Sequence, residues 1–333
     1  MAITASIVDI RGKAYEPIIE EILFENKTVS ENLVSFETDI KSESIFTENV
    51  NTVTMQPFTS GIPTSAGTLG VVDTMITPVK VLYYNEFDMN SLRSSRFKRD
   101  MKAGAWNTAS NEFEKTVLAS YGKLISYDAE KNFWSGITAA TQTAIAALTA
   151  GGGNGSIGAA EKAWAAAQTA GQVDGVIARM MYNNALLGTR VKVAGAVISA
   201  ANIATEYAKA YAAIPAVVIN ASAEKPYLFA PYSHKQFINI YNVSATYRDL
   251  FSVDMKADKY FYNGIEIKFV PLTENTIIAA IPSNIVWCTD LTSDISYMEV
   301  NKIANNREDM FIKNVFTLFA HVVNQKYNVL YQG

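Results

Sequence analysis

The chain has 333 residues, a single cysteine and a formal net charge of −4 at pH 7. This length is enough for one or two domains with a substantial core, and the acidic balance argues against a dedicated nucleic-acid-binding protein. Because Cys288 is alone, no stretch is a plausible membrane span and no secretory signal is visible, we expect a soluble protein made in the cytosol.

The first fifty residues form an acidic N-terminal arm. They contain ten acidic and four basic residues, a balance of −6. Residues 15–25 are predicted to form a short amphipathic helix, because Pro17 is tolerated in a first turn and apolar residues fall on one side. We interpret the arm as a contact element for neighbouring subunits. Its candidate contact residues are Ile18, Ile22, Glu37, Asp39 and Glu43.

Residues 51–72 are predicted to form a long uncharged hairpin. This stretch contains no Asp, Glu, Lys or Arg, and its prolines and glycines exclude a helix. A loop of more than about 12–15 residues without regular structure is uncommon in a compact domain, and disordered stretches are poorer in apolar residues than this one. We therefore expect the hairpin to be ordered by burial against other subunits. Its candidate contact residues are Met55, Phe58, Ile62, Leu69 and Val71.

A strand is predicted over residues 77–87, and Asp88 is a good cap for a short helix that begins at Met89. This helix leads into a basic cluster in which arginines recur every three residues, at Arg93, Arg96 and Arg99. Three interpretations stay open for the cluster: a solvated helix face, pairing with the acidic arm of another subunit, or non-specific contact with nucleic-acid phosphates.

The strongest helix signal covers residues 112–135. Asn111 is a good N-cap, Glu114 supplies the reciprocal acceptor three residues later, and Gly136 ends the helix. At 1.5 Å per residue the helix would be about 36 Å long. One apolar stripe is predicted from the spacing of Phe113, Val117, Tyr121, Leu124 and Ile125. A single long helix with one apolar face indicates a structural spine.

After the spine, an Ala-, Gly- and Thr-rich stretch extends to residue 175, and we interpret its centre, TAGGGNGSIG, as a flexible surface loop. A small α+β domain is predicted next. Its expected helices cover residues 200–213 and 231–241, and its expected strands cover residues 216–220, 227–229, 265–270, 276–281 and 285–288. Residues 311–331 are predicted to close the chain as a β-hairpin that turns near residues 324–326.

The residue patterns do not favour a catalytic, metal or cofactor site. His234 and His321 have no second ligand at metal-binding spacing, and Cys288 lies in an apolar run that is typical of a buried thiol. Residues 153–158 match the spacing G-x-G-x-x-G, but no strand is predicted before them. We therefore expect no catalytic residue, metal or cofactor. A nucleotide-binding enzyme that uses this glycine-rich loop is kept as an alternative.

Two segments and the order of the elements resemble a known family. Residues 113–136 (FEKTVLASYGKLISYDAEKNFWSG) are placed as a spine, and the last third contains IPSNIVWCTDLTSDISYMEV and NNREDMFIKNVFTLFAHVVNQKYNVLY. With the arm and the hairpin, they are similar to the major capsid proteins of tailed phages with the Hong Kong 97-type fold. The resemblance implies an α+β fold with an N-terminal arm (1–45), an extended loop (46–80), a peripheral domain (81–140 and 295–333) containing the spine helix (112–135), and an axial domain (141–294).

The resemblance also implies a structural protein that self-assembles into the icosahedral head shell of a tailed double-stranded DNA phage. Pentamers and hexamers of the chain would form the shell in the host cytoplasm. Portal, scaffolding and decoration proteins would be partners, together with non-specific contact with packaged DNA and no membrane. Family members that crosslink covalently need a Lys, an Asn and a Glu together, and because the lysine near this hairpin is Lys80, at its edge, we expect no crosslink. The shell of an encapsulin-type cellular nanocompartment is the alternative with the same fold.

Overall fold

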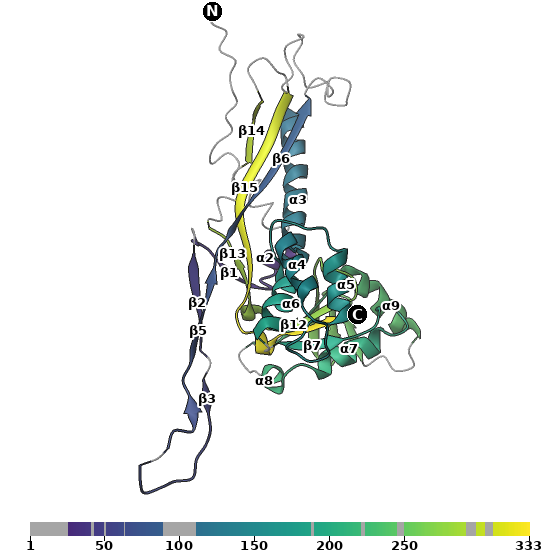
Figure 1. Cartoon of the computed structure of the whole chain (residues 1–333). Coiled ribbons are helices and arrows are strands. Elements are labelled where there is room, and N and C mark those ends of the chain that lie inside the picture. Colours follow the sequence, from purple (N-terminus) through teal and green to yellow (C-terminus); the bar gives the residue numbers. More distant parts are fainter. Residues whose placement is uncertain are drawn as a thin grey trace, which may run out of the picture.

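The computed structural model describes residues 26–40, 43–49, 51–62, 64–88, 111–187, 190–220, 224–244, 250–290, 298–303 and 309–333. Figure 1 shows a rounded body, an extension of one long helix and several strands that rises from it, and a narrow hairpin that projects in the opposite direction. The helices predicted at residues 15–25 and from Met89 lie outside the described residues. The same holds for the candidate residues Ile18, Ile22, Arg93, Arg96 and Arg99.

A five-stranded sheet runs through the extension. Its strands are β1 (Ser35–Glu37), β13 (Ile285–Cys288), β15 (Asp309–Val322), β14 (Met298–Lys302) and β6 (Val79–Asp88). The long β15 is the centre of this sheet, because it pairs antiparallel with the whole of β6 and also with β14 near its start and β13 near its end. The strand predicted at residues 77–87 is confirmed as β6.

The helix α3 (Asn111–Ser135) lies beside this sheet and confirms the predicted spine (Figure 1). Its buried face carries Ile125, Ala129 and Phe133, whereas Leu124, which the predicted stripe included, is 63% exposed. Consecutive residues of a helix point about 100° apart. Leu124 and Ile125 therefore cannot both point towards the sheet. In the structure Ile125 is the buried one.

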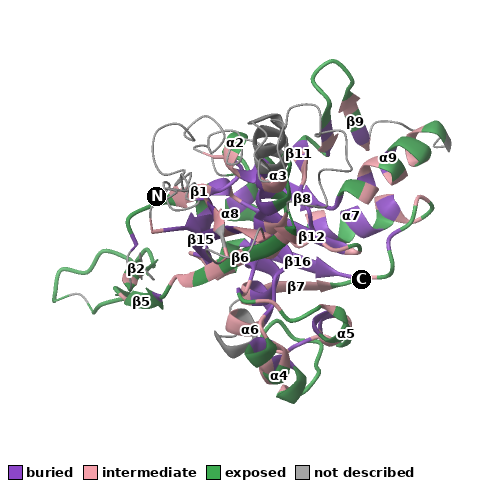
Figure 2. Cartoon of the chain, turned by 90° about the horizontal axis from the view of Figure 1, so that it is seen from above, coloured by how far each residue is buried: buried purple, intermediate pink, exposed green. Residues whose placement is uncertain are grey.

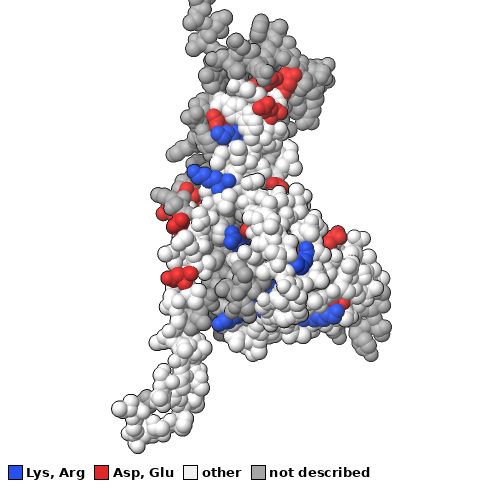
Figure 3. Space-filling view, in the orientation of Figure 1, with Lys and Arg blue, Asp and Glu red and all other residues white. Residues whose placement is uncertain are grey.

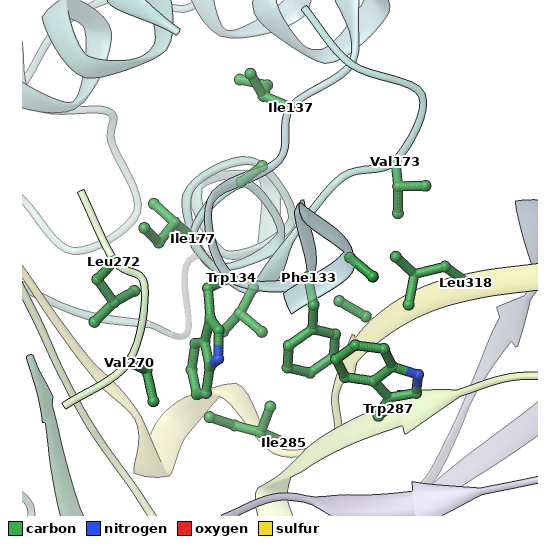
Figure 4. Close-up of a cluster of buried hydrophobic side chains, with 14 of the residues drawn as sticks. Phe133, Trp134, Ile137, Val173, Ile177, Val270, Leu272, Ile285, Trp287 and Leu318 are labelled. Atoms are coloured by element: carbon green, nitrogen blue, oxygen red, sulfur yellow. The ribbon is translucent and has the colours of Figure 1, made fainter. Parts of the chain in front are cut away.

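The last turn of α3 joins the two sheets of the molecule (Figure 4). Phe133 stacks on Trp287 of β13 with ring centroids 4.4 Å apart, and Trp134 lies against Phe229 of the second sheet at 4.9 Å. Removal of one such buried aromatic side chain costs about 3–5 kcal/mol. Directly after the helix, a glycine is required at position 136, because a Cβ there would lie 2.4 and 2.7 Å from two backbone carbonyl oxygens.

A seven-stranded sheet forms the body. In spatial order it contains β7 (Val191–Ala194), β16 (Val329–Gln332), β12 (Thr276–Ala280), β8 (Tyr227–Ala230), β11 (Ile265–Phe269), β10 (Lys259–Tyr262) and β9 (Phe251–Asp254). Successive side chains of a strand point to opposite faces, so Leu228 packs in a cluster with α7 (Ile203–Ala212) and α9 (Tyr232–Ser244), whereas Phe229 packs in the cluster of α3. Both faces of the central strands are therefore covered.

Most of the elements predicted for the body are confirmed, including α7, α9, β8, β11, β12 and β13. The strand predicted at residues 216–220 is wrong, because residues Ala216–Ile219 form the short helix α8. Pro215 is its N-cap, and the Pro215 carbonyl accepts the N–H of Val218 at 2.9 Å. A helical turn that follows a proline thus overrides the β-branched residues, whose intrinsic preference is for strands.

Several elements lie where the sequence analysis expects none. They are the helices α2 (Lys27–Ser30), α4 (Ala139–Ala147), α5 (Ala159–Ala167) and α6 (Val176–Leu187), the 3-10 turn η4 (Pro282–Asn284), and the strands β1, β7, β9, β10 and β14. The helices α4 and α5 flank the glycine-rich loop, and α6 packs between α3 and β15. The Ala-rich stretch is therefore largely helical.

The predicted terminal β-hairpin is wrong, although both of its strands exist. β15 belongs to the five-stranded sheet and β16 to the seven-stranded sheet. Between them the Asn324 side chain accepts the N–H of Lys326, and Asn284 donates to the Asn328 side chain at 2.8 Å. These bonds redirect the chain into the second sheet. The predicted domain boundaries therefore do not follow the sheets. β13 was assigned to the axial domain but pairs in the extension, and β16 was assigned to the peripheral domain but pairs in the body.

Candidate subunit interface

The hairpin (residues 43–76) is a two-stranded ribbon with its own hydrogen bonds. β2 (Ser44–Asn49) pairs antiparallel with β5 (Val71–Ile76), and β3 (Thr52–Val53) pairs with β4 (Gly67–Thr68). The hydroxyls of Thr52 and Thr68 are 2.7 Å apart, and the Gln56 side chain donates to a carbonyl across the ribbon at 2.8 Å. A glycine is required at position 67, where β4 pairs with β3, because a Cβ there would lie 2.4 Å from the Thr52 carbonyl oxygen.

The tip of the hairpin (residues 51–72) carries exposed apolar side chains. Their exposed fractions are 97% for Met55, 96% for Phe58, 100% for Ile62, 91% for Leu69 and 63% for Val71. Figure 3 shows this projection without the blue or red of charged residues along its tip. Full burial of a large apolar side chain contributes roughly 1.5–3 kcal/mol. Each of the five predicted contact residues of the hairpin is therefore an uncovered apolar side chain.

The base of the hairpin, in contrast, is fixed to the five-stranded sheet. Ile76 is fully buried in a small cluster with Ile40, Cys288 and Phe319. The ring centroids of Phe46 and His321 are 5.0 Å apart. A ribbon held firmly at one end presents its tip at a defined distance from the body. This geometry suits a contact with another molecule better than a lid over the same one.

The acidic candidates of the arm lie near this base and not at the tip. Glu37 is exposed on β1 opposite Cys288, the Asp39 N–H donates to the Asp290 carbonyl at 2.6 Å, and Glu43 is exposed directly before β2. The structure thus gathers these three acidic residues around the root of the hairpin. Burial and the nearby Glu37 raise the pKa of Cys288 to about 12, so this thiol stays protonated at neutral pH.

A second uncovered surface, which the sequence analysis missed, lies where α9 meets the edge strand β9 (Figure 2). Val243 is 81% exposed and Met255 is 88% exposed, and Ile240 is about half exposed. Beside them is an open groove of about 680 Å³ that includes Asn239 and Phe251 in its walls. The available sequence signal was the i, i+3 spacing of Ile240 and Val243, on the helix face opposite the buried Ile238.

The two histidines of the chain are buried in the core and have no environment that suggests catalysis. His234 and His321 are buried, and burial lowers the pKa of each to about 4. The Tyr207 hydroxyl and the Nδ1 atom of His234 form a 3.0 Å hydrogen bond. Among the residues that the structure describes, no group of three or more His, Cys, Asp or Glu could hold a metal ion. No helix within the described residues is long and apolar enough to cross a membrane.

The glycine-rich loop lacks the context of a dinucleotide site. It joins two helices, α4 and α5, and the N-terminus of α5 is already occupied by the Glu161 carboxylate, which accepts the Gly158 N–H at 2.5 Å. Arg190 binds the same carboxylate and also donates to the carbonyl of Ser156. The loop lies at the surface as predicted, but Arg190 and Lys192 hold it against the body. A phosphate would have to displace this buried ion pair.

Comparisons with known proteins place this arrangement in a fold. The sequence matches no protein-family model and no curated protein. Its structure is similar to the procapsid of satellite phage P4 that includes the size determination protein (TM-score 0.56, 8% identity, 98% of this chain and 93% of that chain). It is also similar to the capsid of Myoviridae phage XM1 (0.55, 9%, 92% and 91%) and to Mycobacterium phage Ogopogo (0.54, 10%, 91% and 91%). The chain has the Hong Kong 97-type capsid fold, an α+β fold, as predicted.

Proposed function

We propose that this chain is the major capsid protein of a tailed double-stranded DNA phage and that many copies form the icosahedral head shell. The observation that carries the proposal is the hairpin, whose base is buried while Phe58 and Ile62 at its tip are 96% and 100% exposed. The fold shared with phage capsids supports it. An apolar tip without cover from the described residues of its own chain is accounted for when a neighbouring copy supplies that cover.

The parts of the fold then take distinct places in the shell. Residues 1–45 would be the arm, and residues 46–80 the extended loop that reaches over an adjacent copy. The five-stranded sheet with α3 would form the peripheral domain, and the seven-stranded sheet would form the axial domain around five- and sixfold axes. The uncovered surface at Val243 and Met255 supports the second assignment, because it lies at the end of the sheet where copies would meet.

Charge and valency are consistent with a container. A net charge of −4 allows the shell to enclose DNA without binding it strongly, and many modest interfaces add up in a closed assembly. Arg93, Arg96 and Arg99 would contact either packaged DNA or the acidic root of a neighbouring hairpin. A portal, scaffolding proteins and decoration proteins would be further partners in the virion, and assembly in the host cytoplasm would involve no covalent crosslink.

Negative-stain microscopy and sedimentation of the expressed chain test the proposal. We expect closed shells or rings from the natural sequence, and loss of both in the tip variants Phe58→Asp and Ile62→Asp. Val217→Asp is the matched control, because Val217 is also an exposed apolar residue, at 68%, but belongs to α8 and not to the hairpin. Assembly that survives both tip substitutions would contradict the proposed role of the hairpin. Packaged DNA as the natural content would distinguish a virion from a nanocompartment, which would enclose a protein cargo.

A further inference from the structure

Two of the segments that connect the two sheets are bonded to each other. One is η4, between β12 of the body and β13 of the extension, and the other is the turn of residues 323–328, between β15 of the extension and β16 of the body. We call the place where they meet the sheet junction. The Val323 N–H donates to the Asn284 carbonyl at 3.0 Å, so the two segments are joined through their backbones.

The side chain of Asn284 adds further hydrogen bonds to the sheet junction. Its Oδ1 atom accepts the Asn324 N–H at 2.6 Å, and its Nδ2 atom donates to the Asn324 carbonyl at 2.6 Å. The same Nδ2 atom donates to Oδ1 of Asn328 at 2.8 Å. Asn284 is 8% exposed and Asn328 is fully buried. One buried amide on η4 thus holds the turn that leads from the first sheet to the second.

The pairing with Asn324 requires an amide at position 284. The side chain offers one acceptor and one donor to the N–H and C=O of a single residue, as two antiparallel strands do in a hydrogen-bonded pair. A carboxylate has no N–H, so an aspartate at this position would set an oxygen against the Asn324 carbonyl. A leucine of similar size would leave both backbone groups of Asn324 without this partner.

Apolar packing also connects the two sheets, but it acts differently from the amide. Phe133 stacks on Trp287, and Trp134 lies beside them at the end of α3 (Figure 4). The hydrophobic effect is non-directional, whereas a hydrogen bond weakens steeply as its angle departs from linearity. A satisfied buried polar network therefore specifies one arrangement of the elements that it connects.

The sheet junction lies at one end of a long lever. β15 ends at Val322, directly before the turn, and runs from there along the extension (Figure 1). The strand has 14 residues, and at about 3.3 Å per residue it is about 46 Å long. A rotation of about 5° at the junction would therefore move the far end of the strand by about 4 Å. A small change of angle here is enough to misplace a contact made at the far end.

We propose that Asn284 is a positioning residue that fixes the orientation of the body relative to the extension, and through it the curvature at which copies of the chain assemble. The first part concerns one chain alone. The second part rests on the proposed function, because repeated contacts between copies close only at the correct rotation. With the junction loosened, the same contacts close at several rotations and give shells of mixed size.

Distances between two spin labels in the unassembled chain test the first part. The labels would be attached to Ser120→Cys on α3 and Val217→Cys on α8, which replace exposed residues, while native Cys288 is buried. We expect one narrow distance distribution in the natural background, and a broadened or shifted one with Asn284→Leu or Asn284→Asp. The matched control is Asn202→Leu, which removes side-chain hydrogen bonds within the body alone.

Two results would overturn the first part. One is a distribution in Asn284→Leu that is identical to the natural one, and the other is equal broadening by Asn202→Leu. Hydrogen exchange at single-residue resolution gives a second reading that needs no variant, in case the variants fail to fold. The Asn324 amide, although it lies in a turn, should exchange as slowly as the amides of β16. Rapid exchange at Asn324 would show that the Asn284 side chain does not hold the turn.

Electron microscopy of assembled particles tests the second part. We expect one particle diameter from the natural chain and from Asn202→Leu, and mixed diameters from Asn284→Leu. Particles of one diameter from Asn284→Leu, together with a broadened distance distribution, would overturn the link to curvature. A natural chain that forms no particles would overturn the proposed function and the curvature part with it. The distance measurement would still decide the first part, so the two failures are distinguishable.

Discussion

The hairpin and the body use the same kinds of residue in opposite ways. In the body, Phe229, Ile278 and Leu330 are completely buried between the sheet and α3. In the hairpin, Phe58, Ile62 and Leu69 are more than 90% exposed, and Figure 2 shows β2 and β5 as an outlying exposed ribbon next to the buried central strands. An isolated two-stranded ribbon is marginally stable at best. The body thus holds itself together, whereas the hairpin is completed from outside.

The sharpest way to break this comparison is to truncate one phenylalanine in each region. Phe229→Ala should lower the free energy of unfolding by about 3–5 kcal/mol, because it removes a fully buried ring that packs against Trp134. Phe58→Ala should change it by less than about 0.5 kcal/mol, because the ring is 96% exposed and has little packing to lose. Urea denaturation of the unassembled chain measures both. A loss at Phe58 comparable to that at Phe229 would show that the tip folds back onto its own chain.

A second prediction concerns acid. The folded-state pKa values of His234 and His321 are about 4, below the ordinary 6.5, so the unfolded chain binds protons that the native chain excludes. The stability present above pH 6.5 is therefore lost as the pH falls towards 4, by up to about 3 kcal/mol for each histidine.

Denaturant titrations at pH 7.5 and pH 4.5 would measure this loss. Because aspartates and glutamates also titrate below pH 5, the comparison is between the natural chain and His321→Gln, which cannot take up a proton. We expect the variant to show the smaller loss. An identical pH dependence of the two proteins would mean that His321 titrates normally, and hence that the base of the hairpin is open to water.

A smaller effect is expected where α2 is fastened to the spine. Thr28→Val removes the hydroxyl that donates to Glu130 and accepts the indole N–H of Trp134, and should cost about 1–3 kcal/mol. Burial raises the pKa of Glu130 while the bonds from Thr28 lower it, so the pKa in the variant rises further. The loss should therefore be greater at pH 7 than near pH 4. Thr143→Val, in an exposed turn of α4, is the control and should change the stability little.

How much the sequence predicts depends on whether the information is local. The spine helix is predictable because its caps and its apolar residues lie within one segment, and the hairpin because a run without charges stands out. The partners of strands are not local. The runs that become β15 and β16 look alike in sequence, and only packing against β6 and β12 sends them into different sheets. The choice between Leu124 and Ile125 was likewise made by tertiary contacts.

The residues of the candidate interface were likewise predictable only where the signal is local in sequence. The exposed residues of the tip are predictable because nothing nearby in sequence can cover them, and all five lie uncovered in the structure. The surface at Val243 and Met255 is formed by the end of a helix and a strand turn that only the folded sheet brings together. Its two residues look individually like ordinary apolar positions, and this is why sequence reasoning missed it.

Hydrogen exchange of residues 51–72 tests most directly whether the hairpin is completed by other copies. The measurement compares the unassembled chain with assembled particles, with the central strand β12 as an internal reference that is protected in both. We expect rapid exchange of the tip in the unassembled chain and strong protection after assembly. A tip that is already as protected as β12 in a monomer, or one that stays unprotected in the particle, would contradict the account.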